Sequence, residues 1–318
     1  MTTDLAIELD GQYRALREGA GLVDRSTRGM LIVKGPDAAD FLQGQLTNDI
    51  EALAPGQGCY AALLDRKGHM QADMRVLRLG PDEILLDTEP EAREAVLRHL
   101  SMYRIGRELE LDDNPERAIL STIGPQASEL TGVGPLSPEY SHREAELGVA
   151  FLAVATDLGI DLICPTGDAG TLAKALIATG AAEISEAAAE ILRVESGRPR
   201  FGREMTTATI PQEAGIDDRA VSFTKGCYIG QETVARLHYK GKPNRHLRGL
   251  RLETPAENDD PIVLEGREVG RIGTAVLSPA LGPLALAVIR REAKPGDRVA
   301  VGEDDIPAEV AEIPFQDA

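Results

Sequence analysis

The stretch "VAFLAVATDLGIDLICPTGDAGTLAKALIATG" (149–180) contains two apolar runs followed by a helical pattern. A short polar turn separates the run at 149–155 from the run at 159–165, and this arrangement favours a β-hairpin. The segment at 169–180 has the apolar spacing of a helix and ends at Gly180. Strands that pair and then lead into a helix indicate an α+β fold rather than a doubly wound parallel sheet.

The first third of the chain repeats this order of elements. A helix is expected from Pro36, because proline is tolerated in a first turn. A second helix is expected after Thr88, where Thr88 and Glu91 have the spacing of a capping box. Strands are predicted at 28–35, 59–65, 74–79 and 84–87.

After about residue 245 the pattern changes to β-strands alone. Strand-like runs separated by Gly, Pro and Asp turns continue to the C-terminus without a helical pattern, and the charged stretch 253–261 is expected to be an exposed turn. This part of the chain is predicted to form a small β-barrel or sandwich. The runs lie at 246–253, 268–278, 284–290 and 297–302.

Composition narrows the class of protein. A chain of 318 residues suits two or three domains. Its net charge of -18 repels nucleic-acid phosphates and anionic membranes, and aromatic residues at 3% provide few surfaces for stacking bases. We therefore expect neither nucleic acid nor a membrane as a partner. The basic stretch 236–248 is the local exception, and it is either a solvated loop or an anion site.

The compartment is inferred from the N-terminus and the cysteines. The stretch 1–11 has no apolar core and is no signal peptide, and no apolar run approaches the roughly 20 residues that span a bilayer. Cys59, Cys164 and Cys227 form no CxxC pattern and are odd in number. The five histidines lack metal-ligand spacing, so no metal is expected. These features are typical of a soluble, cytoplasmic protein.

Glu195 is an unusual residue for its position. In the predicted helix within 181–197, Ile184, Ala188 and Ile191 share an apolar face with Glu195. A carboxylate there, in the last turn, faces both burial and the negative end of the helix dipole. Either the last turn is frayed into solvent, or Glu195 is buried and holds a polar ligand.

The octet "KGCYIGQE" (225–232) raises a similar choice. A helix is predicted to begin near Ile229, which places Cys227 just before a helix N-terminus and beside Lys225. Both features favour a thiolate, so a reactive thiol and a buried structural cysteine remain equal alternatives. Upstream, Asp65 and Asp73 flank a glycine-containing turn, a position where acids usually shape the turn.

Several stretches together resemble the superfamily of the glycine-cleavage T-protein, an aminomethyltransferase. The octet resembles the signature of its YgfZ-type folate-binding branch. The resemblance covers nearly the whole chain in order, through "GLVDRSTRGMLIVKGPDAADFLQGQLTNDI" (21–50), "LRVESGRPRFGREM" (192–205), "TIPQEAG" (209–215) and "VGRIGTAVLSPALGPLALAVIR" (269–290).

The resemblance implies an α+β, three-domain ring with a C-terminal β-barrel and tetrahydrofolate bound near its centre. Glu195 matches the family carboxylate that recognises the pterin, which agrees with the helix argument. The basic stretch 236–248 is then expected to attract the glutamyl tail of folate. The division expected is 1–115 (folate-binding), 116–190 (ferredoxin-like), 191–245 (folate site and octet) and 246–318 (barrel).

The resemblance also implies site residues and partners. The implied role is support of iron–sulfur cluster assembly or repair through Cys227, with iron–sulfur client or assembly proteins as partners. Cys227, Lys225 and Asp73 are the candidate catalytic residues. The candidate folate contacts are Glu195, Asn48, Asp73, Gly226, Tyr228, Gly230, Gln231, Glu232 and Arg236.

Two alternatives stay open, and whether the protein is an enzyme is not decided by the sequence. The first is a folate-dependent aminomethyltransferase or demethylase of the T-protein class. Against it, this chain has Ala72-Asp73 where T-proteins carry two adjacent acids, and Thr27-Arg28 where they carry His-Met. The second is a non-catalytic protein that senses folate and docks to partners.

Overall fold

The computed structural model describes residues 3–113 and 115–316 and divides the chain into two compact units. The first unit comprises Met1–Leu63, Ala72–Ala189 and Thr224–Ile229, and the second comprises Leu64–Gln71, Glu190–Phe223 and Gly230–Ala318. The four-segment division expected from the sequence remains a prediction. The chain begins with helix α1 (Thr3–Glu18).

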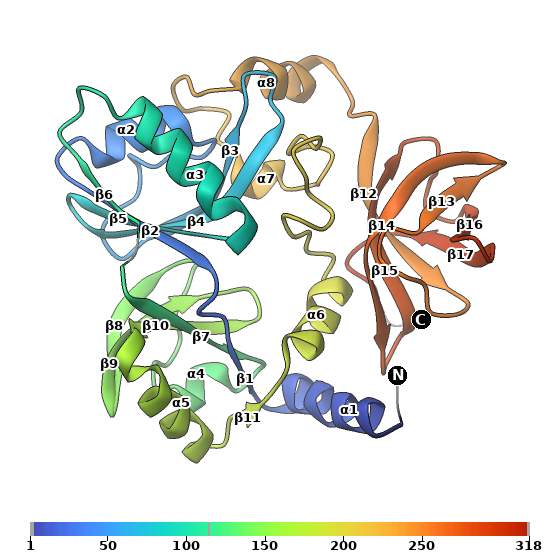
Figure 1. The fold of residues 1–318 in the computed structure, drawn as a ribbon, viewed down its shortest axis with the longest axis horizontal. Coiled ribbons are helices and arrows are strands. Elements are labelled where there is room, and N and C mark those ends of the chain that lie inside the picture. The colour runs from blue at the N-terminus through green and yellow to red at the C-terminus, as the bar shows by residue number, and fades with distance from the viewer. Residues whose placement is uncertain (1–2, 114, 317–318) are drawn as a thin grey trace. The chain divides into compact units, whose positions relative to one another are not determined.

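A five-stranded sheet carries the N-terminal part of the first unit (Figure 1). Its strand order is β3-β4-β5-β2-β6, and the β2–β5, β4–β5 and β2–β6 pairs are antiparallel. Two helices accompany this sheet, α2 (Ala38–Gln45) and α3 (Pro90–Tyr103). The strands are β2 (Gly29–Lys34), β3 (Gly58–Leu64), β4 (Met70–Gly80), β5 (Glu83–Thr88) and β6 (Glu110–Asp112).

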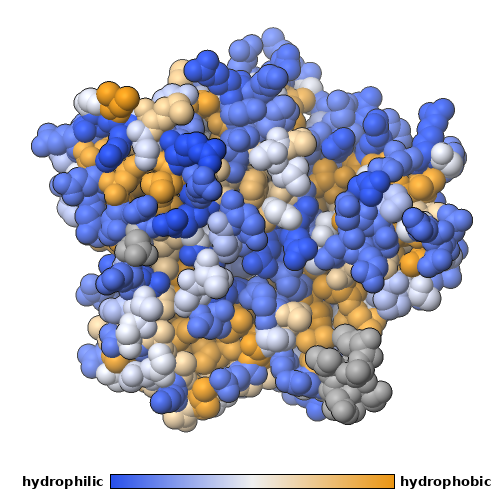
Figure 2. Space-filling model, viewed as in Figure 1, coloured by the Kyte–Doolittle hydropathy of each residue, from blue (hydrophilic) through white to orange (hydrophobic). Residues whose placement is uncertain are grey.

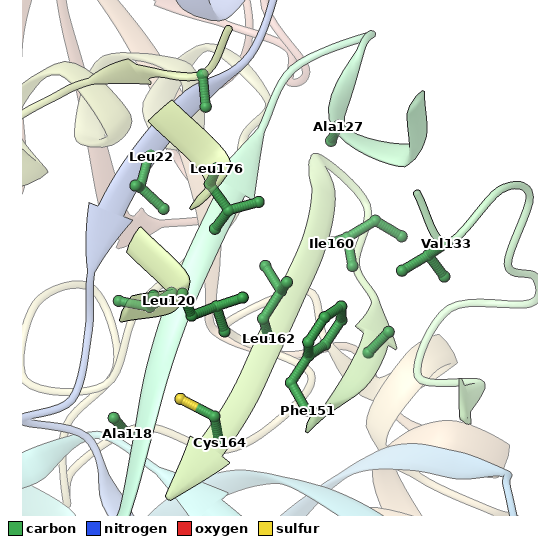
Figure 3. Close-up of a cluster of buried hydrophobic side chains, with 13 residues drawn as sticks. Leu22, Ala118, Leu120, Ala127, Val133, Phe151, Ile160, Leu162, Cys164 and Leu176 are labelled. Atoms are coloured by element: carbon green, nitrogen blue, oxygen red, sulfur yellow. The ribbon is translucent and has the colours of Figure 1, made fainter. Parts of the chain in front are cut away.

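A six-stranded sheet of order β11-β1-β7-β10-β9-β8 completes the first unit. The predicted hairpin is formed by β9 and β10, with Ile160 opposite Ala155, and it leads into α5 as expected. Leu162, Leu172 and Leu176 are fully buried in the core of this part of the unit. Leu162 and Leu176 are drawn in Figure 3. The elements are β1 (Gly21–Asp24), β7 (Arg117–Ile123), α4 (Ala127–Leu130), β8 (His142–Leu147), β9 (Val149–Ala155), β10 (Gly159–Pro165), a 3-10 turn (Thr166–Asp168), α5 (Ala169–Ala178) and β11 (Ala182–Glu183).

The C-terminal strands close into a six-stranded barrel of order β12-β15-β14-β13-β16-β17. The predicted mixed α+β fold with a C-terminal barrel is therefore confirmed. Strands β13 and β17 were not predicted from the sequence. Three helices precede the barrel: α6 (Glu186–Glu195), α7 (Asp217–Ala220) and α8 (Gln231–Lys240). The barrel strands are β12 (Arg245–Leu252), β13 (Pro261–Leu264), β14 (Arg267–Ser278), β15 (Gly282–Arg290), β16 (Arg298–Val301) and β17 (Ile306–Ala311).

Four helix starts differ from the sequence predictions. Helix α2 begins at Ala38, two residues after the predicted start at Pro36. Helix α3 begins at Pro90 without a capping box, because the hydroxyl of Thr88 donates to the carbonyl of Asp73 at 2.6 Å instead. Helix α6 begins at Glu186, so Ile184 lies outside it. Helix α8 begins at Gln231, two residues after the predicted start at Ile229.

Polar residues cover much of the face drawn in Figure 2. Within residues 3–113 and 115–316, no helix has the combination of length and hydropathy that crossing a membrane requires.

Candidate functional site

Asp73 is a buried carboxylate beside a tyrosine. It lies on β4, next to the Tyr60-bearing strand β3, and the hydroxyl of Tyr60 donates to Asp73 Oδ2 at 2.5 Å. Burial raises the pKa of Asp73, the hydrogen bond from Tyr60 lowers it, the nearby Glu89 raises it and Arg28 lowers it, and the net result is a pKa of about 6. A carboxyl group with this pKa exchanges its proton readily near neutral pH.

Arg28 balances the acidic residues around Asp73. Its guanidinium donates to Asp87 at 2.7 Å and to Glu89 at 2.5 Å. The Arg28 side chain is 18% exposed. Asp87 is fully buried and also contacts Arg75, which pairs with Asp161. Arg28 is thus part of an extended ion network. Such a network fixes the backbone that carries Asp73.

Lys225 is placed differently from its sequence prediction as a partner of Cys227. Its ammonium group donates to three main-chain carbonyls at the end of α2, those of Gln43, Leu46 and Asn48, at 2.6, 2.8 and 2.7 Å. These three bonds match the three N–H donors of an ammonium. Burial lowers the pKa of Lys225 to about 8, and it also stands 5.3 Å from the centroid of the Tyr228 ring. Lys225 therefore ties the octet to the loop after α2.

The three cysteines occupy three different environments. Cys227 is exposed, whereas Cys164 is fully buried in the core of the six-stranded sheet. Burial raises the pKa of Cys59 to about 12, with Lys225 lowering it. Cys227 is thus the exposed cysteine, Cys59 is partly buried, and the structural alternative of a buried Cys227 is wrong. Cys227 lies four positions before the first residue of α8. It is therefore farther along the chain from the helix N-terminus than the predicted start at Ile229 implied.

The other octet residues divide between open and tightly packed positions. A side chain at Gly226 would meet no atom within 4 Å, whereas one at Gly230 would lie 2.5 Å from the carbonyl oxygen of Asp65. Gly230 also has a φ of +86°, so glycine is required there. Tyr228 is buried, and burial raises its pKa to about 12. Gln231, Glu232 and Arg236 lie on α8, with Glu232 and Arg236 exposed.

Asn48 uses its amide within its own loop. The amide nitrogen donates to the carbonyl of Tyr60 at 2.8 Å, and the amide oxygen accepts from the backbone of Asp49 at 2.9 Å. These bonds hold the loop after α2 against β3, the strand that carries Tyr60.

Glu195 in the second unit is buried, as one of the two sequence alternatives requires. Its side chain is 6% exposed, and its Oε1 accepts a hydrogen bond from Ser278 Oγ at 2.6 Å. Ser278 in turn accepts bonds from the backbone of Ala280 and Leu281. The frayed-helix alternative is therefore wrong. The preceding turn of α6 is held by Arg193, which bonds to Glu190, Glu204 and Thr274 and was missed by the sequence analysis.

The second unit also contains a cavity of about 450 Å³. It is lined by Lys67, His69, Ala208, Ile210, Glu213, Thr233, Asn244, Arg245 and Arg290. Of the stretch 236–248, Asn244 and Arg245 line this cavity, and Arg245 is its one basic residue there. In the part of the chain that the structure describes, no group of three His, Cys, Asp or Glu side chains is placed so that it could hold a metal ion.

Sequence reasoning missed Tyr60, although a signal was present. Tyr60 and Asp73 are nearly equidistant from the turn at 65–68, and the two strands of a hairpin bring such positions opposite each other. No spacing in the sequence predicted that Arg28 would bind Asp87 and Glu89. They come from β5 and its end, and their pairing depends on the order of the strands in the sheet.

Comparison with known proteins gives a family for both parts of the chain. Residues 7–225 match the GCVT N-terminal domain, and residues 245–317 match the glycine cleavage T-protein C-terminal barrel domain. An aminomethyltransferase of Rubrobacter xylanophilus is 29% identical over 326 residues, covering 96% of this chain and 86% of that protein. A putative chloroplastic transferase of Arabidopsis thaliana is 30% identical, covering 96% of this chain and 73% of that protein.

A solved structure agrees with the fold. The glycine cleavage system aminomethyltransferase T from Bartonella henselae superimposes with a TM-score of 0.87 at 24% identity, covering 97% of this chain and 90% of that chain. At 24% identity the match supports the fold alone. The named relatives favour the transferase reading, which the sequence analysis ranked second, over the iron–sulfur reading that it ranked first.

Proposed function

The chain belongs to the glycine cleavage T-protein family, and we propose that it is a folate-dependent enzyme that transfers a one-carbon unit from an amine-bearing donor to tetrahydrofolate. The relatives named above as aminomethyltransferases support this class of reaction. The observation that carries the proposal is Asp73, a buried carboxyl group with a pKa of about 6 that is held by Tyr60.

The chemistry of the transfer requires a group of this kind. A folate nitrogen forms a bond to the one-carbon unit as that carbon's bond to its donor breaks. The donor leaves with the bonding electron pair and takes up a proton, and the folate nitrogen gives up its own proton. The carboxylate of Asp73 accepts that proton. A base whose pKa lies near the working pH is deprotonated often enough to act and still basic enough to hold the proton.

Glu195 is proposed to recognise the pterin of tetrahydrofolate. The amino and ring N–H groups of a pterin suit a carboxylate that accepts two parallel hydrogen bonds. Ser278 fixes one oxygen of Glu195, and burial strengthens any bond the other oxygen makes. The further folate contacts implied by resemblance are Asn48, Gly226, Tyr228, Gly230, Gln231, Glu232 and Arg236, and they remain proposals.

The test of this function is a transfer assay. The purified chain is incubated with tetrahydrofolate and an aminomethyl-loaded lipoyl carrier protein, and in parallel with simple N-methyl amines. The folate product, which is methylene-tetrahydrofolate from the first donor and methyl-tetrahydrofolate from the second, is measured by mass spectrometry. We expect product with at least one donor, at a rate that depends on the enzyme. Absence of product with every donor would remove the proposal, and folate binding without turnover would favour the non-catalytic folate sensor.

A second candidate function rests on Cys227. Its exposure within the octet supports the finer YgfZ-type assignment, in which the protein supports iron–sulfur assembly or repair in the cytoplasm through a reactive thiol. Native Cys227 should be alkylated rapidly while Cys164 is protected, and a Cys227→Ser variant should lose the rapidly labelled thiol. Iron–sulfur enzyme activities in cells carrying that variant should fall to the level of a deletion. Full rescue by the serine variant would exclude this role.

A further inference from the structure

Arg193 uses every hydrogen-bond donor of its side chain. A guanidinium group carries five N–H donors, and five hydrogen bonds leave this one, all to acceptors in the second unit. Nε and Nη2 donate to the two carboxylate oxygens of Glu190 at 2.8 and 2.9 Å. The other three bonds go to Glu204 Oε2 at 3.1 Å, the Arg198 carbonyl at 2.5 Å and Thr274 Oγ1 at 2.8 Å. Because the fork of donors is rigid, these bonds together hold it in one orientation.

The charge of Arg193 is balanced at the place where it is buried. Its side chain is 12% exposed, and the side chain of Glu204 is fully buried. Burial lowers the pKa of Arg193, whereas Glu204 and Glu190 raise it above its usual value. A buried charge that loses its partner is strongly destabilising. The guanidinium and the two carboxylates therefore keep one another in place.

Glu204 and Thr274 connect this network to strand β14. Thr274 belongs to β14 and accepts a hydrogen bond from Arg193. A side chain at the neighbouring Gly273 would lie 2.9 Å from Glu204 Oε1, so the carboxylate packs directly on the backbone of the strand. Arg193 therefore attaches helix α6 to β14 both directly and through Glu204.

The same strand holds Glu195. Ser278 Oγ donates to Glu195 Oε1 at 2.6 Å, and Ser278 lies four residues after Thr274 on β14. The pairing of β14 with β15 is regular from Thr274 to Ser278, so these two side chains project from the same face of the strand. Arg193 and Glu195 are two residues apart at the end of α6. The last turn of α6 is thus attached to one face of β14 at two points.

Packing closes the space between the two points of attachment. Val194 is fully buried in a core cluster, and the Phe315 N–H donates to the carbonyl of Glu195 at 2.9 Å. The cluster contains Val194, Leu247, Leu284, Leu286 and Phe315. Because the backbone of this turn is held on both sides, the direction of the Glu195 carboxylate depends on how α6 meets β14. The bonds of Arg193 determine that geometry.

We infer that Arg193 is a positioning residue, which fixes the carboxylate of Glu195 in the orientation that recognition of a pterin needs. The inference rests on the folate binding proposed above. A carboxylate that accepts two parallel hydrogen bonds is selective when its plane is aligned with both donors. Such alignment requires supporting residues that hold the group within about 0.5 Å of its working position. Since all five donors of Arg193 are engaged, it acts through β14 and Ser278 and not by contact with the ligand.

A double-mutant cycle isolates this role. Thr274→Val keeps the branched shape of the side chain and removes the acceptor that joins Arg193 to β14. It is made in the wild type and in the Glu195→Gln background. Arg193→Lys is a second probe, because lysine keeps the charge but has three donors in place of five. Thr254→Val is the matched control, because Thr254 is an exposed threonine that follows β12 of the same barrel.

Each full-length protein is titrated calorimetrically with tetrahydrofolate and with an analogue that lacks the 2-amino group of the pterin. Thermal unfolding shows that each titrated variant is folded. The wild type should bind tetrahydrofolate at least about tenfold more tightly than the analogue, the factor of one charge-assisted hydrogen bond. Thr274→Val and Arg193→Lys should each lower this ratio severalfold, and Thr254→Val should keep it.

The cycle distinguishes positioning from a general structural role. Thr274→Val should weaken tetrahydrofolate binding about tenfold in the wild type and less than about twofold in the Glu195→Gln background, because both residues act through one carboxylate. Equal losses in the two backgrounds, or an unchanged ratio in both Thr274→Val and Arg193→Lys, would overturn the inference and leave folate binding intact. A wild type that binds no tetrahydrofolate would overturn the proposed function and this inference together.

Discussion

Tyr60 Oη lies 2.5 Å from Asp73 Oδ2, and this hydrogen bond joins two neighbouring strands of the five-stranded sheet. The bond stabilises the ionised form of Asp73, whereas burial and Glu89 stabilise the protonated form. The opposing effects leave the pKa of Asp73 at about 6. The pKa of Asp73 in this pair underlies the predictions below on pH-dependent stability and on proton transfer.

Removal of the Tyr60 hydroxyl should raise the pKa of Asp73 above about 6. Tyr60→Phe keeps the ring and deletes the donor that favours the carboxylate. The measurement is a carboxyl carbon-13 NMR titration of aspartate-labelled protein, with Asp73→Asn used to assign the resonance. A midpoint in Tyr60→Phe at or below the wild-type value would show that the hydroxyl does not stabilise the charge.

The stability of the wild type relative to Asp73→Asn should depend on pH with a definite sign. The folded-state pKa of Asp73 is raised from 3.8 to about 6, so the native state holds this proton more tightly than the unfolded chain. The associated stability is complete below about pH 4 and is lost as pH rises through 6. The loss is on the order of 2–3 kcal/mol at about 1.4 kcal/mol per pKa unit.

Urea unfolding of both proteins between pH 4 and pH 8 measures this difference. As pH rises, the free energy of unfolding of the wild type should fall relative to that of Asp73→Asn, because the asparagine amide has no charge to bury. A difference in unfolding free energy that stays constant with pH would contradict the raised pKa.

Lys225→Met should destabilise the fold by several kcal/mol. Methionine keeps much of the side-chain volume but leaves the carbonyls of Gln43, Leu46 and Asn48 without their donor. A fully buried acceptor that loses its donor costs about 1–3 kcal/mol, and these three carbonyls are partly buried, so their total lies below the sum of three such costs. Thermal unfolding compares this variant with Lys242→Met, an exposed lysine. Equal midpoints for the two variants would assign Lys225 a role other than anchoring the octet.

Glu195→Gln should weaken tetrahydrofolate binding by about 10- to 100-fold. Glutamine keeps the shape of the side chain but has no charge and one acceptor oxygen, and hydrogen bonds to charged groups contribute about 1.5–3 kcal/mol. Calorimetry at fixed salt measures the affinity. Ser278→Ala is the companion variant and should give a smaller loss, because it frees the orientation of Glu195 and leaves its charge. Undiminished affinity in Glu195→Gln would show that this carboxylate does not contact the ligand.

The sequence predicted secondary structure correctly where local patterns of residues determine it. Alternation and turn residues predicted the hairpin at 149–165. Helical spacing identified Glu195 as an unusual carboxylate and left burial and fraying open, and the structure shows burial. Helix starts were less accurate because tertiary bonds compete with local ones. The Thr88 hydroxyl, which could have capped α3, bonds to a neighbouring strand instead.

The site was less predictable than the fold because its contacts join distant segments. Lys225 and the loop after α2 are about 180 residues apart along the chain, and no periodicity links them. Proximity in sequence therefore suggested Cys227 as the partner of Lys225, whereas the folded chain offers three carbonyls. The cavity likewise combines Lys67 with Arg290, which a linear reading does not connect.

Single-turnover transfer of a one-carbon unit to tetrahydrofolate by Asp73→Asn tests the central claim most directly. Proton transfer by a positioned carboxylate contributes about 10²- to 10⁴-fold to such a rate. The variant should therefore bind tetrahydrofolate as the wild type does and react at least about 100-fold more slowly, without the limb near pH 6 in the wild-type pH–rate profile. A variant that reacts within a few fold of the wild type, with the same pH profile, would contradict the role of Asp73 as the proton acceptor.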